Sequence, residues 1–484
     1  MAARTGKEYI EGLNDGRETW IDGKKIDVVS YASFQGSLKG MAGYFDWQHK
    51  YADECLVKDE VSGELMSASL ILPKNKEDLI ARGKCFEQLA KYSNGMLGRT
   101  PDYCNVALTG YVSRVDAFID AGHEDWAKNL QDFHRECIEK DLSLTHTIIQ
   151  PQPDKSKPDL DGINGEVAFK VVERRDDCIV VSGAKILATL GPFSDELFVY
   201  PSAPIMSEGT ADHALMFSIP VNTKGVIMVC RDHYEVQADI KDAPFSSRFD
   251  EQDAYVILDK VEVPLNRVFM DGDLEFYNKT VMDQLGRYGN ITQQTATRAA
   301  VKLEFAYDLC MRMAEIIKTD KRPEVVMMLG EIWSYAQLTR SSISAGFNAA
   351  FDWGNGAYFF DDSPMRALIA NMPQWMIRVN EIIKVIGSHN LLATPSVSSY
   401  KNTDMKDLLN QYMPAANDSS AEDRAKIFRI AWDFAGSALG GRVELYERYY
   451  LTSQPRNQMF CHNHAQKKFE WNQLEEFMVS CGIK

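Results

Sequence analysis

Residues 168–189 read AFKVVERRDDCIVVSGAKILAT, and this stretch predicts two β-strands joined by the charged turn at residues 174–177. Four more short runs follow it: DELFVYPSA, HALMFSIPV, GVIMVCRD and AYVILDKVEVP. Each run is rich in β-branched or aromatic residues and is separated from the next by Gly, Pro or Asp, which is typical of an antiparallel sandwich or barrel. We therefore predict a central antiparallel β barrel or sandwich over residues 146–275.

The segments on either side of this β region have helical periodicity. In residues 1–145, apolar side chains recur every three or four positions, most clearly over residues 76–92 and 114–140, which predicts an N-terminal helical domain. In residues 276–484, four long segments each carry a wide apolar face, at 298–318, 324–352, 365–387 and 421–450. They predict a C-terminal four-helix bundle that also serves oligomerisation. The predicted fold is a multidomain α+β protein in the order helical, β, helical.

The composition excludes several classes of partner. The chain has 484 residues, of which 53 are basic and 69 acidic, giving a net charge of −16. Such a surface repels phosphate backbones and anionic lipids, which argues against nucleic-acid and membrane partners. No apolar run approaches the roughly 18 residues of a membrane helix, and the N-terminal MAARTGKEYIEG has no signal-peptide core. Nine scattered cysteines without a C-x-x-C pair predict a reduced, cytoplasmic protein.

Common catalytic motifs are missing from the sequence. It has no G-x-G-x-x-G after a strand, no Walker A loop, no H-E-x-x-H and no G-x-S-x-G. Nothing therefore indicates a nicotinamide, nucleotide or zincin site. Cys461, His462 and His464 lie close together, but no fourth ligand accompanies them, so a polar loop is favoured over a zinc site. We predict no metal.

Two polar segments are candidates for a site. In GMLGRTPDYCN, residues 95–105, Pro101 suits the first position of a helix, and Arg99 and Tyr103 lie four residues apart. A guanidinium beside a phenol suits an anion such as a phenolate, although a capped helix start explains the same residues. In LSLTHTIIQ, residues 142–150, His146 lies where the helical and β regions meet. Domain junctions favour ligand pockets, but a lone histidine in an apolar run is more often an ordinary core residue.

Two further segments could approach a planar ligand. Residues 184–204, AKILATLGPFSDELFVYPSAP, contain Thr189, Gly191 and Ser202, which offer hydroxyl groups and a close backbone approach. Residues 433–450, DFAGSALGGRVELYERYY, contain three glycines near the end of a helical pattern. Such glycines admit either a cofactor or another helix.

Taken together, GRTPDY, L-x-x-T-H-T-I, GAKILATLGPFSDE and GSALGGR–ELYER resemble the oxygenase component of 4-hydroxyphenylacetate 3-monooxygenase and its relatives. The resemblance extends over nearly the whole chain, and it implies an acyl-CoA-dehydrogenase-like fold and a homotetramer. It also implies that FAD is used as FADH2, supplied by a separate NAD(P)H-flavin reductase, with molecular oxygen as co-substrate. The implied reaction is ortho-hydroxylation of a para-substituted phenol to a catechol through a C4a-hydroperoxyflavin.

The resemblance also implies roles for individual residues. Arg99, Tyr103 and His146 would surround the phenolic hydroxyl as the catalytic residues, and Ser202 and Ala203 would lie near the tail of the substrate. Some relatives have a hydroxyl-bearing residue where this chain has Ala203, which leaves the tail group of the substrate open. The implied flavin-lining residues are His146, Thr147, Ile148, Gln152, Pro153, Asp154, Lys155, Thr189, Gly436, Ser437, Ala438 and Leu439.

Three alternatives to the hydroxylase make different demands on the sequence. 4-Hydroxybutyryl-CoA dehydratase, a lyase of the same superfamily, needs iron–sulfur ligands where this chain has Arg99, Tyr103 and Asn290, and Cys104 is one position away from a ligand slot. An acyl-CoA-dehydrogenase-type flavoenzyme needs a carboxylate base that no motif indicates. A catalytically silent scaffold would not retain the polar trio of Arg99, Tyr103 and His146. The identity of the phenol and the choice between dimer and tetramer stay open.

Overall fold

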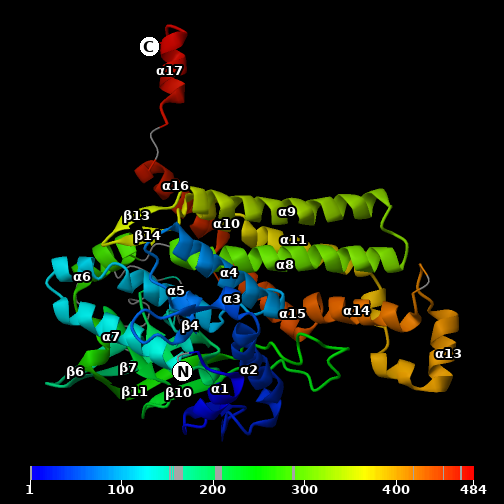
Figure 1. Cartoon of the computed structure of the whole chain (residues 1–484), viewed down its shortest axis with the longest axis horizontal. Coiled ribbons are helices and arrows are strands. Elements are labelled where there is room, and N and C mark those ends of the chain that lie inside the picture. The colour runs from blue at the N-terminus through cyan, green and yellow to red at the C-terminus, as the bar shows by residue number, and fades with distance from the viewer. Residues whose placement is uncertain are drawn as a thin grey trace.

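The computed structural model describes residues 3–151, 154, 156, 167–201, 210–285, 289–417, 419–450, 452–468 and 471–483. In Figure 1 the larger sheet, which includes β6, β7, β10 and β11, occupies the lower part of the molecule, and long helices run side by side above it. The chain passes from helices into sheets and back into helices. The predicted order of helical, β and helical parts is confirmed.

The ends of the N-terminal helices follow their local side-chain chemistry. The Asn75 side chain accepts a hydrogen bond from the Asp78 N–H at the start of α4, and α4 is followed by Asn94 in the left-handed region, with φ of 50°. The segment predicted as one helix over residues 114–140 is two helices, because Gly122 turns the chain with φ of 82°. The helices are α1 (Gly6–Gly12), α2 (Gln35–Lys50), α3 (Ala52–Cys55), α4 (Lys76–Ser93), α5 (Pro101–Val112), α6 (Asp116–Asp120) and α7 (Glu124–Lys140).

The β region forms two sheets that pack face to face as a sandwich. The larger sheet has the order β2-β1-β10-β11-β7-β6, and the smaller has the order β12-β9-β8-β5. Val181 and Val256 of the larger sheet share one apolar core with Leu197 and Phe217 of the smaller. These strands are β1 (Glu18–Ile21), β2 (Lys24–Ile26), β5 (Leu144–His146), β6 (Lys170–Arg174), β7 (Cys178–Thr189), β8 (Glu196–Val199), β9 (Leu215–Pro220), β10 (Val226–Cys230), β11 (Asp253–Pro264) and β12 (Val268–Asp271).

Two strand pairs depart from the antiparallel pattern. β1 pairs with β10 and β5 pairs with β8 in parallel, whereas the other neighbours in these two sheets are antiparallel. β1 and β2 come from the N-terminal segment, so residues 18–26 extend the larger sheet. A small separate hairpin is formed by β3 (Leu56–Lys58) and β4 (Leu65–Ser67).

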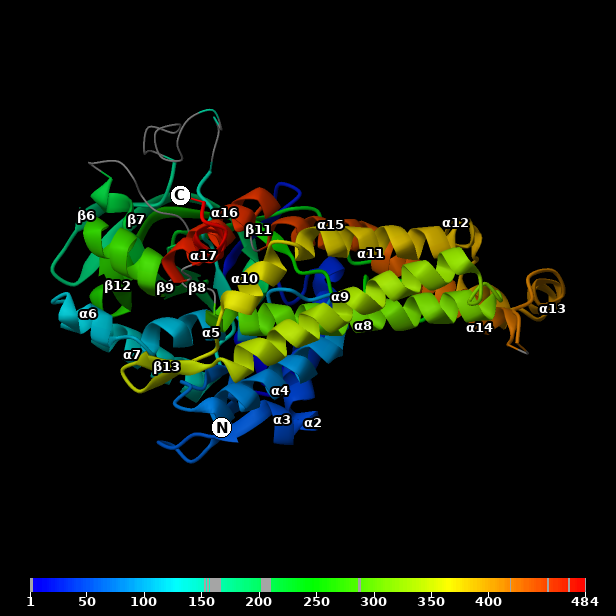
Figure 2. The ribbon, with the colours of Figure 1, turned by 90° about the horizontal axis from the view of Figure 1, so that it is seen from above.

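Long helices after residue 288 form the bundle, and Figure 2 shows them running side by side. The segment predicted over 365–387 is divided into α10 and α11, and the segment predicted over 421–450 is divided at Gly436. Residues 351–359 form a hairpin where the sequence predicts the end of a helix. The elements are α8 (Gly289–Ile316), α9 (Pro323–Asn348), β13 (Phe351–Gly354), β14 (Ala357–Phe359), α10 (Ser363–Ile369), α11 (Met372–Gly387), α12 (Asn390–Ala393), α13 (Thr403–Tyr412), α14 (Ala421–Ala435) and α15 (Ala438–Tyr449).

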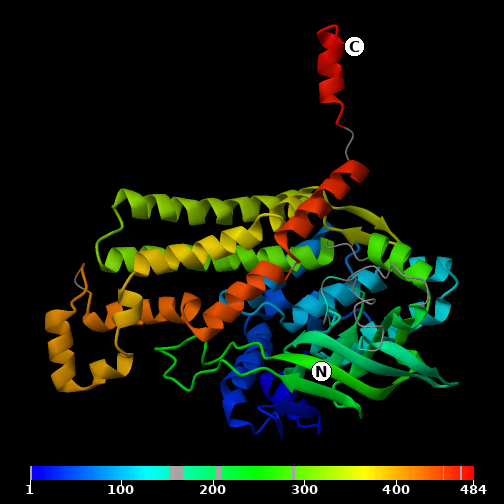
Figure 3. The same ribbon diagram turned by 180° about the vertical axis from the view of Figure 1, so that it is seen from behind.

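The last two helices leave the bundle. α16 (Gln454–Lys468) runs along its end, and α17 (Gln473–Ser480) stands clear of the rest of the molecule in Figure 3. Leu474 and Phe477 on α17 are largely exposed. Within the described residues, no helix combines the length and the apolar character needed to cross a bilayer.

A second apolar core positions the candidate site. It joins the N-terminal helices to the smaller sheet, with Phe133 of α7 packed against Phe198 and Phe269. Six residues of α5 belong to the same core: Tyr103, Cys104, Ala107, Leu108, Tyr111 and Val112. α5 therefore carries candidate residues directly onto the edge of the sandwich.

Candidate active site

Arg99 lies just before α5, with its guanidinium buried against aromatic rings. Its Cζ atom is 3.8 Å from the centroid of the Tyr103 ring, and its Nη2 donates to the carbonyl of Tyr450 at 2.8 Å. The neighbouring Gly98 lets the Tyr446 ring approach the backbone closely, because a Cβ atom there would meet that ring at 2.4 Å. Thr100 precedes the helix and Pro101 occupies its first turn, as predicted. The two candidates at the start of α5 are thus in contact with each other.

His146 ends β5 and lies among the same rings. Its ring centroid is 5.2 Å from that of Tyr103 and 5.6 Å from that of Tyr200. Its Nδ1 is 3.4 Å from the Sγ of Cys104. Burial, and then the positive charge of Arg99, hold the pKa of His146 well below its usual range, so the imidazole is neutral at pH 7. The structure therefore brings together the three residues predicted to surround the phenolic oxygen.

Several polar atoms in this cluster have no protein partner. Among the described residues, Arg99 Nη1, Thr147 Oγ1 and Tyr200 Oη are buried without a hydrogen bond. Buried polar atoms are nearly always paired in folded proteins, and an exception calls for an explanation. Two of these residues lie within the cluster, Arg99 against Tyr103 and Tyr200 against His146, and their unpaired atoms fit a site that receives a polar ligand. Tyr200 follows the strand β8 and was not among the predicted residues, because a buried tyrosine there has the same sequence signal as a core residue.

Of the predicted flavin-lining residues of the β region, Thr189 is linked to β5, the strand that ends at His146. The Thr189 hydroxyl donates to Asp253 Oδ1 at 2.8 Å, and its carbonyl accepts from Thr145 Oγ1 at 2.8 Å. The carbonyl of Ile148 accepts from the buried Lys185 amine at 3.4 Å, and burial lowers the pKa of Lys185 to about 8. Asp154 accepts two hydrogen bonds from Ser156. Gln152, Pro153, Lys155, Ser202 and Ala203 lie outside the described residues.

The predicted cofactor residues of the bundle form the junction between α14 and α15. Gly436 follows the end of α14, and Ser437 caps α15 by accepting a hydrogen bond from the Gly440 N–H at 3.0 Å. Leu439 is buried. A Cβ atom at Gly440 would lie 2.9 Å from the Phe434 carbonyl oxygen, so the two helices approach closely here. Ala438 is the first residue of α15.

Largely buried ion pairs connect these segments. Glu251 accepts hydrogen bonds from the backbone N–H groups of Gly98 and Arg99 at 2.7 and 2.5 Å. Its other oxygen accepts from Arg442 of α15 at 2.7 Å, and Arg442 also binds Asp253 at 2.7 Å. The loop before α5, the sandwich and the bundle therefore meet at Arg442. Nothing in the sequence pattern indicates Glu251 or Asp253, because their partner lies about 190 residues away.

Comparisons with known proteins agree with this arrangement. The family model described as "4-hydroxyphenylacetate 3-hydroxylase N terminal" matches residues 5–270, and the corresponding C-terminal model matches residues 279–478. The oxygenase component of 4-hydroxyphenylacetate 3-monooxygenase from Geobacillus sp. (strain PA-9) is 32% identical over 456 residues, covering 93% of this chain and 91% of the relative. A crystal structure of such a component with FAD and 4-hydroxyphenylacetate superposes with a TM-score of 0.91 at 29% identity, covering 99% and 98% of the two chains.

The fold and the site together define a flavin-dependent monooxygenase. More narrowly, the chain belongs to the 4-hydroxyphenylacetate 3-hydroxylase family.

The dehydratase shares the architecture alone. An archaeal 4-hydroxybutyryl-CoA dehydratase from N. maritimus superposes with a TM-score of 0.87, but it is 18% identical, over 100% of this chain and 95% of the other. Arg99 and Tyr103, the positions at which the resemblance implies cluster ligands for the lyase, stack on each other in this chain. In the part of the chain that the structure describes, no group of three His, Cys, Asp or Glu residues could hold a metal ion.

Proposed function

We propose that this chain is the oxygenase component of a two-component system that converts a para-substituted phenol, of the 4-hydroxyphenylacetate type, to a catechol. A separate NAD(P)H-flavin reductase would supply the FADH2. The observation that carries the proposal is the buried contact of Arg99, Tyr103 and His146 beside polar atoms that lack a protein partner. The related structure that holds FAD and 4-hydroxyphenylacetate supports it.

The residues present fit a flavin. Thr147 offers a buried hydroxyl without a partner, and Thr189 and the start of α15 reach the same junction through Asp253 and Arg442. We assign binding of the isoalloxazine to His146, Thr147, Ile148 and Thr189, and contact from the bundle side to residues 436–439. Reduced FAD, when bound, supplies the oxygen atom that it takes from molecular oxygen. Gln152, Pro153, Asp154 and Lys155 complete the proposed flavin-binding set.

The protein's own contribution is charge and position. Arg99 keeps its positive charge at every physiological pH, and burial strengthens its attraction for a phenolate oxygen. A phenolate ring is more electron-rich at its ortho carbon than a neutral phenol, so Arg99 favours the attack. The Tyr103 ring lies against the guanidinium, with its centroid 3.8 Å from Arg99 Cζ. Its hydroxyl is proposed to form a hydrogen bond with the phenolate oxygen. Because His146 is neutral, it contributes a hydrogen bond and no charge.

The same buried cluster excludes water. Arg99, Tyr103 and His146 are each less than 10% exposed. A dry site protects activated oxygen from release as hydrogen peroxide and holds the ring close to it. Ser202 and Ala203 are proposed to lie near the substituent opposite the phenolic hydroxyl.

The decisive experiment combines the purified chain with NADH, FAD and an unrelated flavin reductase. A panel of para-substituted phenols is then screened by mass detection for addition of one oxygen atom. We expect a catechol from at least one phenol, and no NADH oxidation when the reductase is left out. If NADH is consumed with every phenol but only hydrogen peroxide forms, the proposal is wrong.

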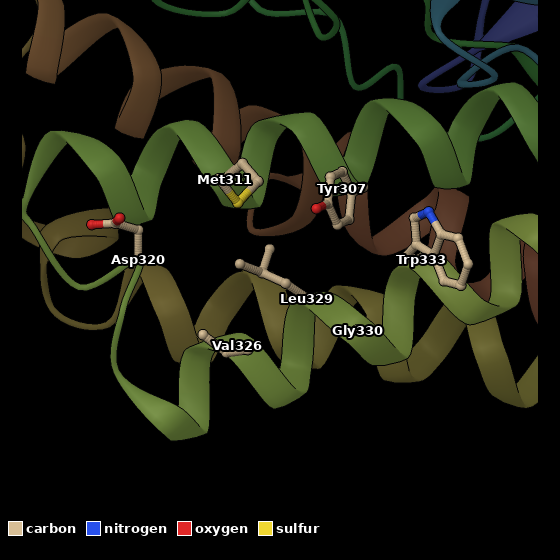
Figure 4. Close-up of a pocket in the computed structure, with 7 residues that line it drawn as sticks. All are labelled: Tyr307, Met311, Asp320, Val326, Leu329, Gly330 and Trp333. Atoms are coloured by element: carbon tan, nitrogen blue, oxygen red, sulfur yellow. The ribbon is translucent and has the colours of Figure 1, made fainter.

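We also propose that the chain forms a homotetramer in the cytoplasm. In Figure 4, Tyr307 and Met311 of α8 face Leu329 and Trp333 of α9 across a groove of about 390 Å³ on the side of the bundle. α9 carries large exposed apolar residues, two of which, Val326 and Trp333, line this groove; we call the set the α9 face: Val326, Met327, Trp333 and Leu338. Covering such a face by another copy of the chain would remove it from water. All nine cysteines are free thiols, which suits a reducing compartment.

A further inference from the structure

We propose that Cys104 is a positioning residue that fixes the tautomer of His146. Its thiol donates a hydrogen bond to Nδ1, so the ring proton of His146 resides on Nε2. The role of that proton toward the substrate rests on the function proposed above, whereas the thiol–imidazole contact does not.

The contact is fixed by two rigid elements. Cys104 lies in the first turn of α5, and its Sγ is 3.4 Å from Nδ1 of His146. His146 pairs with Phe198 in the parallel register of β5 and β8. The rings of Tyr103 and Tyr200 lie near the imidazole, and their planes are inclined to its plane by 33° and 40°. The imidazole is thus held by neighbouring rings, and its Nδ1 edge meets the thiol.

The protonation states leave one sensible direction for this hydrogen bond. A neutral imidazole has one N–H group and one acceptor nitrogen. His146 is neutral, and burial raises the pKa of the Cys104 thiol to about 12, so the sulfur keeps its hydrogen. A thiol sulfur is a weak acceptor, whereas an imidazole nitrogen is a good one. The S–H group therefore donates to Nδ1, and Nε2 carries the proton.

This tautomer gives His146 a definite task. With the proton on Nε2, the ring offers a hydrogen-bond donor to an oxygen in the site and cannot remove a proton through that atom. The opposite tautomer would present a lone pair to a phenolate held by Arg99, and the two would repel each other. His146 then orients the phenolate, while Arg99 supplies the charge.

The test compares Cys104→Ala, which removes the donor, with Cys104→Ser, which keeps it. Cys310→Ala is the matched control, because Cys310 is equally buried but lies in the bundle. The first readout needs no flavin: nitrogen NMR of the 15N-histidine-labelled protein, with His146→Gln to assign the signals. We expect wild type and Cys104→Ser to show an acceptor-type Nδ1 and a protonated Nε2. Cys104→Ala should shift both signals toward a mixture of tautomers.

The second readout is the ratio of catechol to hydrogen peroxide. Loss of one hydrogen bond should lower it about fivefold in Cys104→Ala, with recovery to within about twofold in Cys104→Ser. A protonated Nδ1 in the wild type, or unchanged signals and unchanged ratio in Cys104→Ala, would overturn the inference. If the nitrogen signals respond but no phenol is ever hydroxylated, the contact stands and the proposed function falls.

Discussion

The guanidinium of Arg99 is a buried charge surrounded by rings. Its Cζ atom lies 3.8 Å from the centroid of Tyr103, 5.2 Å from that of Tyr446 and 5.7 Å from that of Tyr450. These rings hold the guanidinium by cation–π attraction. A carboxylate partner would neutralise its charge, whereas the rings do not. The charge stays available to an anionic ligand.

Arg99→Ala should therefore impair hydroxylation more than flavin reoxidation. Loss of a charge-assisted hydrogen bond is worth roughly 1.5–3 kcal/mol, or about 10- to 150-fold in catechol formation. Catechol and hydrogen peroxide are measured together at saturating FADH2. Arg175→Ala is the control, because Arg175 is an exposed arginine on the β-hairpin with two carboxylate partners. If Arg99→Ala forms catechol as efficiently as this control, Arg99 merely precedes a helix.

Glu196 is a second buried ionisable residue, and it makes stability depend on pH. Its side chain accepts a hydrogen bond from Ser218 on the neighbouring strand at 2.8 Å, and burial raises its pKa to about 7 although Arg267 is nearby. The pKa of Glu196 is about 4.5 in the unfolded chain and about 7 in the folded protein, so its contribution to stability is fully present below pH 4.5. That contribution is lost as the pH rises through 7, because the buried carboxyl must then give up its proton.

Glu196→Gln, which stays neutral, should gain stability relative to wild type as the pH rises. The gain between about pH 5 and about pH 8 should be about 2–3 kcal/mol, at 1.36 kcal/mol per pKa unit. Urea unfolding midpoints of both proteins at the two pH values measure it. An equal difference at both pH values would mean that Glu196 is already charged at pH 5.

Two adjacent glycines in the first turn of α15 differ in the space around them: Gly440 is crowded and Gly441 is open. A Cβ atom at Gly440 would meet backbone atoms of Phe434 and Ala435 at 2.9 Å, whereas one at Gly441 would meet nothing within 4 Å. Gly440→Ala should destabilise the protein by about 1–3 kcal/mol through overpacking. It should also weaken FADH2 binding, because the start of α15 has to move.

Gly441→Ala is the matched control for that change. It should leave FADH2 affinity unchanged and stabilise α15 by about 0.5–1 kcal/mol, since alanine is the better helix former. Thermal unfolding and anaerobic titration with FADH2 measure the two effects. Equal FADH2 affinities of the two variants would mean that α15 does not approach the cofactor.

The hydrophobic periodicity of the sequence predicts the helices and strands better than it predicts which strands pair with each other. The strands between residues 168 and 264 and the long helices of the bundle have clear periodicity, because each buries one face. β1 and β2 have four and three residues, which is too short for a period, and they join the sheet through contacts with a distant strand. The choice between sandwich and barrel depends likewise on which strands pair.

Some residues of the candidate site could be predicted from the sequence and others could not. Arg99, Tyr103 and His146 could be named because they stand in recognisable motifs, and the structure places them in contact. Cys104 and Tyr200 could not, because a buried cysteine and a buried tyrosine are also ordinary core residues. Their significance comes from a neighbour across the fold, which no local pattern encodes.

At the scale of the whole molecule, the α9 face predicts how copies assemble. Trp333→Glu, combined with Met327→Glu, places charges on side chains that are 55% and 68% exposed. We expect the assembly to dissociate into smaller species, because buried unpaired charges are costly. Sedimentation velocity measures the mass. Val61→Glu, at an 80% exposed residue far from the bundle in sequence, is the control and should leave the mass unchanged. A tetramer that survives the double change would place the interface elsewhere.

Arg442 has a consequence for exchanging parts between members of this family. It is the cation on the bundle that pairs with two carboxylates, the buried Glu251 just before β11 and the largely buried Asp253 at the start of β11. A chimera that joins this sandwich to a bundle with an uncharged residue at that position would bury both acids with fewer cations. The reciprocal chimera would bury an arginine. Recombination between the sandwich and the bundle should therefore yield folded protein only when the two parents carry matching charges at positions 251, 253 and 442. The boundary between the β region and the bundle, although clear in the sequence, is thus unsuitable as a crossover point.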